Sequence, residues 1–225
     1  MTWVKICGMT NLEDALVAVD AGADAVGFVF HDKSPRCVTV EKAREIVAKL
    51  PAGVEKVGVF VDADCEQMRE IVVNSALTAV QLHGKSSLES VLTDSRPANE
   101  CVGVSKVILM IPGNALQDGG IMISRPARDK AFALLIDSAA DGVNGGSGKT
   151  FDWSATRGMV QGLSLSIPVI VAGGLNPLNV GEAMRMLQPF GVDVVSGVEA
   201  SQGKKDPEKV RAFVKAVRGM DRKAG

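Results

Sequence analysis

The sequence has no excess of charge of either sign. Its 225 residues include 25 lysines and arginines against 26 aspartates and glutamates, which gives a net charge of -1. Proteins that bind nucleic acids or anionic membrane surfaces usually carry an excess or a clear patch of basic residues. We therefore expect no nucleic-acid or membrane partner, although a local group of basic side chains could still bind a small anion.

Long apolar runs are missing as well. No stretch reaches the roughly 18 uninterrupted apolar residues that a transmembrane helix requires. The first residues reach a glycine at Gly8 and lack the apolar segment of a signal peptide. The sequence thus indicates neither secretion nor membrane insertion, and it favours a cytoplasmic protein.

Cysteines are few and widely separated. The four of them, Cys7, Cys37, Cys65 and Cys101, form no C-x-x-C pair, and their spacing does not suggest a zinc site. We expect a reduced protein without a metal centre, in which Cys37, Cys65 and Cys101 are small buried apolar side chains.

What the sequence does contain fits one α/β domain over residues 1–225. With 46% hydrophobic residues, the chain can bury a sizeable core, and its length falls within the roughly 200–250 residues of an α/β barrel. Short apolar segments alternate with amphipathic stretches, which predicts eight β-then-α units around a parallel sheet. The predicted strands are Trp3–Cys7, Ala25–Phe30, Val57–Val61, Ala79–Leu82, Val102–Met110, Ala133–Asp137, Pro168–Ala172 and Val192–Ser196.

Helices are predicted between these strands, where an N-cap residue precedes an apolar pattern of helical period. The segment Ile111–Lys130, broken by prolines and glycines, predicts no helix. The predicted helices are 12–19 with Thr10 or Asn11 as cap, Val40–Leu50, Ala63–Asn74, a weaker one from near Ser86, one from Asp152 or Ser154 to Leu163, one opened by Asn176 and Pro177, and Asp206–Val217.

A doubly wound sheet and a closed (βα)8 TIM barrel both suit this alternation, and the last two loops favour the barrel. Gly173-Gly174 follows the seventh predicted strand, and Ser196-Gly197 ends the eighth. Glycine lets backbone N–H groups approach an anion closely, and barrels often hold phosphate after strands seven and eight. Either pair alone could mark only a turn, but the two together favour a phosphate site.

The central stretch Ala133–Ser138 ends an apolar strand in Asp137, close before the loop Gly145-Gly146-Ser147-Gly148. In an α/β barrel the active site lies at the C-terminal ends of the strands. The run from Gly148 to Thr150 matches the end of a P-loop, but Val143 stands where that motif needs glycine. No strand leads into a dinucleotide-binding glycine turn either. We interpret the loop as one that flexes over a substrate.

Four side chains are candidates for chemistry at the same end of the barrel. Cys7 ends the first predicted strand, Arg36 follows the second, His83 follows the fourth, and Asp137 ends the sixth. Each has an ordinary alternative: a buried thiol, a surface charge, a turn residue and a cap. Their convergence on one mouth is what favours catalysis.

Five motifs in this chain, in order, resemble those of the phosphoribosylanthranilate isomerase family of tryptophan biosynthesis. The resemblance covers nearly the whole chain and implies a (βα)8 barrel. It also implies an Amadori rearrangement of N-(5-phosphoribosyl)anthranilate to its 1-deoxyribulose isomer, without metal or organic cofactor. The motifs are Lys5-Ile6-Cys7-Gly8, Gly27 to Phe30 with Ser34-Pro35-Arg36, Val80 to Gly84, Gly145 to Trp153, and Ala172 to Leu175.

By this resemblance Cys7 is the general base and Asp137 the general acid. To protonate the ribose ring oxygen, Asp137 must hold a proton near neutral pH, which requires surroundings that raise its pKa. An ordinary thiol is only a few per cent thiolate at pH 7, so either a neighbour lowers the pKa of Cys7 or the substrate assists. Lys5 lies two residues back on the same face of the strand and is the candidate neighbour.

The resemblance also implies the binding roles. Arg36 would bind the anthranilate carboxylate, for which a planar guanidinium offers two parallel donors. Gln81 and His83 would lie at the mouth, with open roles. The phosphate would be held by the backbone of Gly146, Ser147, Gly173, Gly174, Ser196 and Gly197.

Two alternatives stay open, and so does the number of subunits. A barrel isomerase that also accepts the histidine-pathway aminoaldose would be expected to use paired aspartates, so Cys7 argues against it. A catalytically dead paralogue that binds phosphorylated ligands or a partner protein would not need Cys7, Asp137 and Arg36. The number of subunits cannot be inferred, because an apolar helix stripe looks the same against the sheet and against a second subunit.

Overall fold

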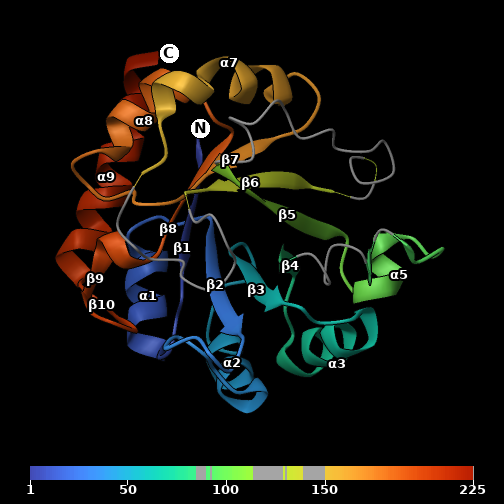
Figure 1. The fold of residues 1–225 in the computed structure, drawn as a ribbon. Helices are drawn as coiled ribbons and strands as arrows, with labels where there is room; N and C mark the ends of the chain where they lie inside the picture. Colours follow the sequence, from blue (N-terminus) through green and yellow to red (C-terminus); the bar gives the residue numbers. More distant parts are fainter. Residues whose placement is uncertain (85–89, 92, 114–128, 130, 139–149, 225) are drawn as a thin grey trace.

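The computed structural model describes residues 1–84, 90–91, 93–113, 129, 131–138 and 150–224. Eight parallel strands close into a barrel in the order β1 to β8, and the helices lie outside it (Figure 1). This confirms the predicted (βα)8 architecture and excludes the doubly wound sheet. The strands are β1 (Trp3–Cys7), β2 (Ala25–Phe30), β3 (Glu55–Val61), β4 (Ala79–His83), β5 (Lys106–Pro112), β6 (Ala133–Asp137), β7 (Val169–Val171) and β8 (Gly191–Val194).

Most of the helices begin at residues whose side chains cap free backbone N–H groups. Asn11, Thr39, Asp64 and Asp152 each accept a hydrogen bond from the N–H group three residues further on. Two possible caps were predicted for α1 and for α7, and the structure uses Asn11 for the first helix and Asp152 for the second. The helices are α1 (Leu12–Asp20), α2 (Val40–Val47), α3 (Cys65–Ser75), α5 (Ala98–Val102), α7 (Trp153–Ser164), α8 (Val180–Leu187) and α9 (Pro207–Ala224).

Two predicted element starts are wrong, and the last helix, α9, ends at Ala224 and not at the predicted Val217. Val102 ends the short helix α5 and does not begin a strand, because a short apolar run fits a buried helix end as well as a strand. Asn176 does not cap α8, which begins at Val180. Its side chain instead accepts from the N–H groups of Leu178 and Asn179 in the preceding turn. The predicted helix start near Ser86 and most of Ile111–Lys130 lie outside the described residues.

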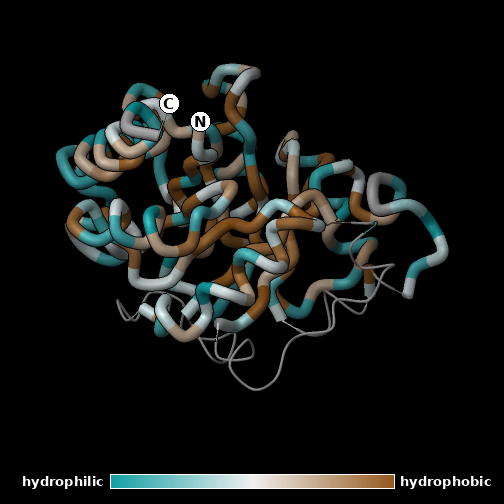
Figure 2. The backbone as a smooth tube through the Cα atoms, turned by 90° about the horizontal axis from the view of Figure 1, so that it is seen from above, coloured by the Kyte–Doolittle hydropathy of each residue, from teal (hydrophilic) through white to brown (hydrophobic). Residues whose placement is uncertain are grey.

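Side chains along each strand alternate between two apolar layers. On β1, Val4 and Ile6 belong to the large core between barrel and helices, so Trp3, Lys5 and Cys7 face the barrel interior. A second cluster, with Ala25 and Leu135 among its members, fills that interior. Hydropathy follows this arrangement, with hydrophobic residues gathered centrally and hydrophilic ones toward the periphery (Figure 2).

The chain closes on itself after β8. A 3₁₀ turn, η2 (Ser196–Val198), leads into a small hairpin of β9 (Glu199–Ser201) and β10 (Lys204–Lys205), which lies beside α1 (Figure 1). Thr2 is hydrogen-bonded to the Asp221 carboxylate, so the two termini meet. Among the described helices, none is long and apolar enough to cross a membrane.

Candidate active site

An ion pair lies inside the barrel below its C-terminal mouth. Lys5 on β1 donates to Asp193 on β8 at 3.0 Å, and the two side chains are 0% and 4% exposed. Burial alone would lower the pKa of Lys5, but the charge and hydrogen bond of Asp193, with a further contribution from Cys7, outweigh it and raise that pKa. The ammonium group therefore stays charged beneath the site.

Cys7 is the next inward-facing residue of β1, and its thiol is buried. Burial raises the pKa of this thiol, and Lys5, which acts in the opposite direction, does not offset it. Lys5 therefore acts on Cys7 in the direction proposed from the sequence. The net effect in the ligand-free site nevertheless favours a protonated thiol. The sequence left two ways to form the thiolate: a neighbour that lowers the pKa of Cys7, or assistance from the substrate. Because Lys5 does not offset burial, assistance from the substrate is needed as well.

Two buried polar side chains face the same space from β4. Gln81 and His83 are 4% and 8% exposed, and both alternate with core residues that point to the helices. The Oε1 atom of Gln81 and the Nδ1 atom of His83 have no hydrogen-bond partner in the described structure. Buried polar atoms are usually paired, so these two atoms are candidates for contact with a ligand.

His83 should make the protein less stable in mild acid. Burial, with the Lys5 charge adding to it, lowers the pKa of His83 to about 4. The unfolded chain then binds a proton near pH 6.5 that the folded protein binds only near 4. The contribution of the neutral ring to stability is therefore fully present above about pH 6.5. As the pH falls from there toward 4, the free energy of unfolding decreases by about 3 kcal/mol.

Urea unfolding at several pH values measures this effect. In wild type the free energy of unfolding should fall more steeply between pH 6.5 and 4 than in His83→Asn. Identical slopes in the two proteins would contradict a depressed pKa of His83.

Asp137 ends β6 at the mouth, half-buried, with the Ser138 hydroxyl 3.5 Å from its Oδ1 atom. Its charge acts on Asp193, and those of Lys5 and Asp193 act on His83. The side chains predicted from separate strands thus share one electrostatic environment at the C-terminal end of the barrel.

Arg36 follows β2 and is 7% exposed. It forms a two-point ion pair with Glu199, which the sequence analysis did not identify. Lys205 donates to the same carboxylate at 3.3 Å. Only the acidic residue two positions after Gly197 in the eighth loop could have pointed to this pair.

The predicted phosphate loops come together because glycine permits it. A Cβ atom on Gly173 would lie 2.3 Å from the backbone N of Ser138, and one on Gly197 would lie 1.9 Å from the Leu175 carbonyl oxygen. The ends of β6, β7 and β8 are therefore packed backbone against backbone. Within the described part of the chain, the N–H groups of Gly173 and Gly174 donate to no other residue. Gly146 and Ser147 lie outside the described residues.

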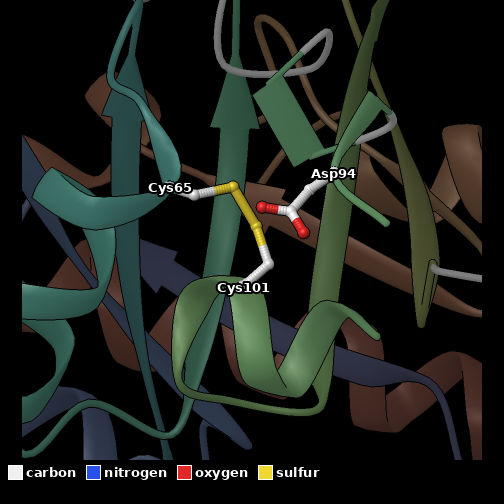
Figure 3. A group of neighbouring side chains, drawn as sticks. All are labelled: Cys65, Asp94 and Cys101. Carbon is white, nitrogen blue, oxygen red and sulfur yellow. A yellow bond between two sulfur atoms is a disulfide. The ribbon is translucent and has the colours of Figure 1, made fainter. Parts of the chain in front are cut away.

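The expectation of isolated, reduced cysteines is wrong for two of them. Cys65 at the start of α3 and Cys101 in α5 form a disulfide (Figure 3). Cys37 is free but only half-buried. Sequence spacing missed the pair because α3 and α5 pack side by side.

Among the described residues, one cluster has side chains of the types that bind metal ions: Cys65, Cys101 and Asp94. The Asp94 carboxylate lies beside the two sulfur atoms (Figure 3). The sulfurs of Cys65 and Cys101 are bonded to each other, however, and Asp94 is paired with Arg96 at 2.7 Å. These residues are therefore not free to act as thiolate and carboxylate ligands.

Known proteins share this arrangement over almost the whole chain. The sequence model of N-(5'phosphoribosyl)anthranilate (PRA) isomerase matches residues 4–216. The chain belongs to the PRA isomerase family. A curated PRA isomerase of Thermotoga neapolitana is 44% identical over 220 residues, which cover 98% of this chain and 100% of the relative.

Solved PRA isomerases have the same fold. A structure described as monomers of the dimeric enzyme from Thermotoga maritima is 37% identical, with a TM-score of 0.76, and covers 97% of this chain and 100% of its own. A PRA isomerase in complex with reduced 1-(o-carboxyphenylamino)-1-deoxyribulose 5-phosphate is also 37% identical, with a TM-score of 0.73 and the same coverage. PRA isomerases thus match this chain in both sequence and fold.

Proposed function

We propose that this chain isomerises N-(5'-phosphoribosyl)anthranilate to 1-(2-carboxyphenylamino)-1-deoxyribulose 5-phosphate in tryptophan biosynthesis. The observation that carries the proposal is that a buried thiol, Cys7, and a carboxyl group, Asp137, each end a strand at the same end of a barrel of this family. An Amadori rearrangement requires one group that gives a proton and one that takes a proton.

In the proposed reaction Asp137 acts as the general acid. It donates a proton to the ring oxygen of the ribose, the bond between that oxygen and C1' breaks, and the nitrogen lone pair forms the C1'=N bond of a cationic imine. The imine acidifies the neighbouring C2'–H bond. The mouth position of Asp137, half-buried beside Ser138, leaves it open to the substrate.

Cys7 acts as the general base in the next step. Its thiolate removes the C2' proton, and the resulting enolamine tautomerises to the ketone by losing the proton of its C2' hydroxyl and gaining a proton at C1'. Because burial disfavours the thiolate in the ligand-free site, the positive charge of the imine is expected to assist its formation.

Replacing Lys5 by methionine should shift the pH–rate profile. Lys5 lowers the pKa of Cys7 more than Asp193 raises it, so losing the ammonium raises that pKa whether or not Asp193 then takes up a proton. The rise of kcat/KM with pH should therefore move to higher pH.

Lys56→Met is the matched control, because Lys56 is a buried lysine that donates to the Pro51 carbonyl. Its profile should stay that of wild type. A Lys5→Met profile that does not move would contradict the influence of Lys5 on the thiol.

The binding roles follow the same scheme. Arg36 would bind the anthranilate carboxylate with the edge of its guanidinium that Glu199 does not occupy. Gln81 and His83, with their unpaired buried atoms, would contact the sugar or the bridging nitrogen. The phosphate would be held by backbone N–H groups of the glycine loops Gly173-Gly174 and Ser196-Gly197, together with Gly146 and Ser147.

We propose that the enzyme works in the cytoplasm, where a biosynthetic enzyme meets its phosphosugar substrate. Cell fractionation with a tagged chain tests this. Association with further subunits is a separate question, since one solved relative is described as dimeric, and sedimentation equilibrium answers it.

Growth of a tryptophan auxotroph tests the activity in a cell. In a bacterial strain that lacks its own PRA isomerase, expression of this chain should restore growth without tryptophan. A folded, expressed chain that does not restore growth would contradict the proposal.

A further inference from the structure

The Arg36 guanidinium is held from one side by a carboxylate. Its Nε and Nη2 atoms donate to the two oxygens of Glu199, each at 2.7 Å. The two side chains are only 8% and 6% exposed. Such a two-point contact fixes the plane of the guanidinium as well as its position.

Glu199 is itself fixed by the hairpin that carries it. Lys205 on β10 donates to the Glu199 carboxylate at 3.3 Å, and Lys209 on α9 donates to its backbone carbonyl at 2.8 Å. Thr10, in the loop after β1, donates to the Gly203 carbonyl at the hairpin turn at 2.6 Å. The hairpin is thus anchored to the loop that follows Cys7.

The stem of Arg36 is confined as well. Gly8 packs against it so closely that a Cβ atom there would lie 2.7 Å from the Arg36 Cδ. The Arg36 backbone N–H group donates to the Ser34 hydroxyl at 3.2 Å. Among the described residues, no acceptor takes a hydrogen bond from Nη1, so this edge of the fork is left for a ligand.

Charge points the same way. Arg36 and Lys205 share the single carboxylate of Glu199, and burial lowers the pKa of Lys205, whereas the hydrogen bonds to Glu199 raise the pKa of Arg36, so the guanidinium stays charged. The free edge of this charged guanidinium is suited to one more anionic oxygen group, such as a ligand carboxylate.

We propose that Glu199 is a positioning residue, which holds Arg36 so that its free edge meets the carboxylate on the aromatic ring of the substrate. This inference rests on the proposed function, because it assumes that Arg36 binds that carboxylate. Glu199 would then set specificity for an acidic aromatic amine without touching the reacting atoms. Its removal should weaken binding of the substrate and spare the chemical step.

Two substrates separate this role from a merely structural one. N-(5-phosphoribosyl)aniline, made from aniline and ribose 5-phosphate, has the same sugar but lacks the carboxylate. In Glu199→Gln an amide NH₂ faces a guanidinium donor, so one of the two contacts is lost. KM for phosphoribosylanthranilate should rise about tenfold to a hundredfold with kcat within about threefold, whereas kcat/KM for the aniline compound should stay that of wild type.

Two further variants complete the test. In an Arg36→Met background, Glu199→Gln should cause no additional loss, because the group that it positions is gone. Glu208→Gln, an exposed glutamate on α9, is the matched control and should behave as wild type. If Glu199→Gln alone does not fold, Glu199→Gln/Lys205→Met, which removes both members of the contact, is measured in its place.

The outcomes are distinct. An equal loss with both substrates, an unchanged KM, or a further loss in the Arg36→Met background would overturn the role of Glu199. Wild type that does not turn over phosphoribosylanthranilate would instead overturn the proposed function.

Discussion

Cys7→Ala should lower kcat by about a thousandfold, and Asp137→Asn should do the same. General acid–base groups typically contribute about 10²–10⁴-fold, and the proposed reaction requires one such group at each step. Neither substitution adds volume, and although alanine removes the hydrogen bond between Lys5 and the Cys7 thiol, Lys5 keeps its ion pair with Asp193. Both variants should therefore fold and still bind the product. The loss of aminobenzoate fluorescence as the substrate is consumed measures kcat.

Two substitutions at residues without a proposed role serve as controls for this pair. Cys37→Ala removes the other free thiol, which is half-buried in the loop after β2, and Asp20→Asn changes an exposed carboxylate at the end of α1. Both should retain wild-type kcat. If Cys7→Ala or Asp137→Asn, folded by circular dichroism, kept more than about a tenth of wild-type kcat, its proposed acid–base role would be wrong.

Gly27→Ala should lower kcat by about a hundredfold although it removes none of the proposed catalytic groups. Gly27 on β2 pairs with Cys7 on β1, and a Cβ atom there would lie 2.5 Å from the Cys7 sulfur and 3.2 Å from its Cα. A rotamer change cannot relieve a contact with the backbone, so the thiol and its strand must shift. Displacing a catalytic group by about 1 Å can cost about 10²-fold.

Gly158→Ala is the matched control, because a Cβ atom at that position in α7 meets nothing within 4 Å. It should keep wild-type kcat and stabilise the protein by about 0.5–1 kcal/mol through its helix propensity. Titration with a maleimide should find the same number of thiols in both variants. Wild-type kcat in Gly27→Ala would contradict the exact placement of the Cys7 thiol as a requirement of catalysis.

The fold could be predicted because its signals are local. Each barrel strand is an apolar run with a polar or glycine boundary, and the caps Asn11 and Asp152 mark helix starts directly. The (βα)8 order follows from the alternation and from the two glycine loops near the C-terminus. The error at Val102 arose where an apolar run of a few residues carries no period.

The candidate site was predictable only in part, because its supporting contacts join residues far apart in the chain. Cys7, His83 and Asp137 could be placed at one mouth, since each stands at the end of its own strand. The partner of Arg36 could not, because Glu199 lies 163 residues away in a hairpin that has no strong sequence pattern. The disulfide between Cys65 and Cys101 depends in the same way on how two helices pack.

The most direct test of the account is the fluorescence decay of freshly generated phosphoribosylanthranilate with the purified wild-type chain. The account predicts a decay far faster than in buffer, proportional to enzyme concentration, with 1-(2-carboxyphenylamino)-1-deoxyribulose 5-phosphate identified as the product by NMR. A folded chain that leaves the decay at its uncatalysed rate would contradict the isomerase assignment and leave only the barrel.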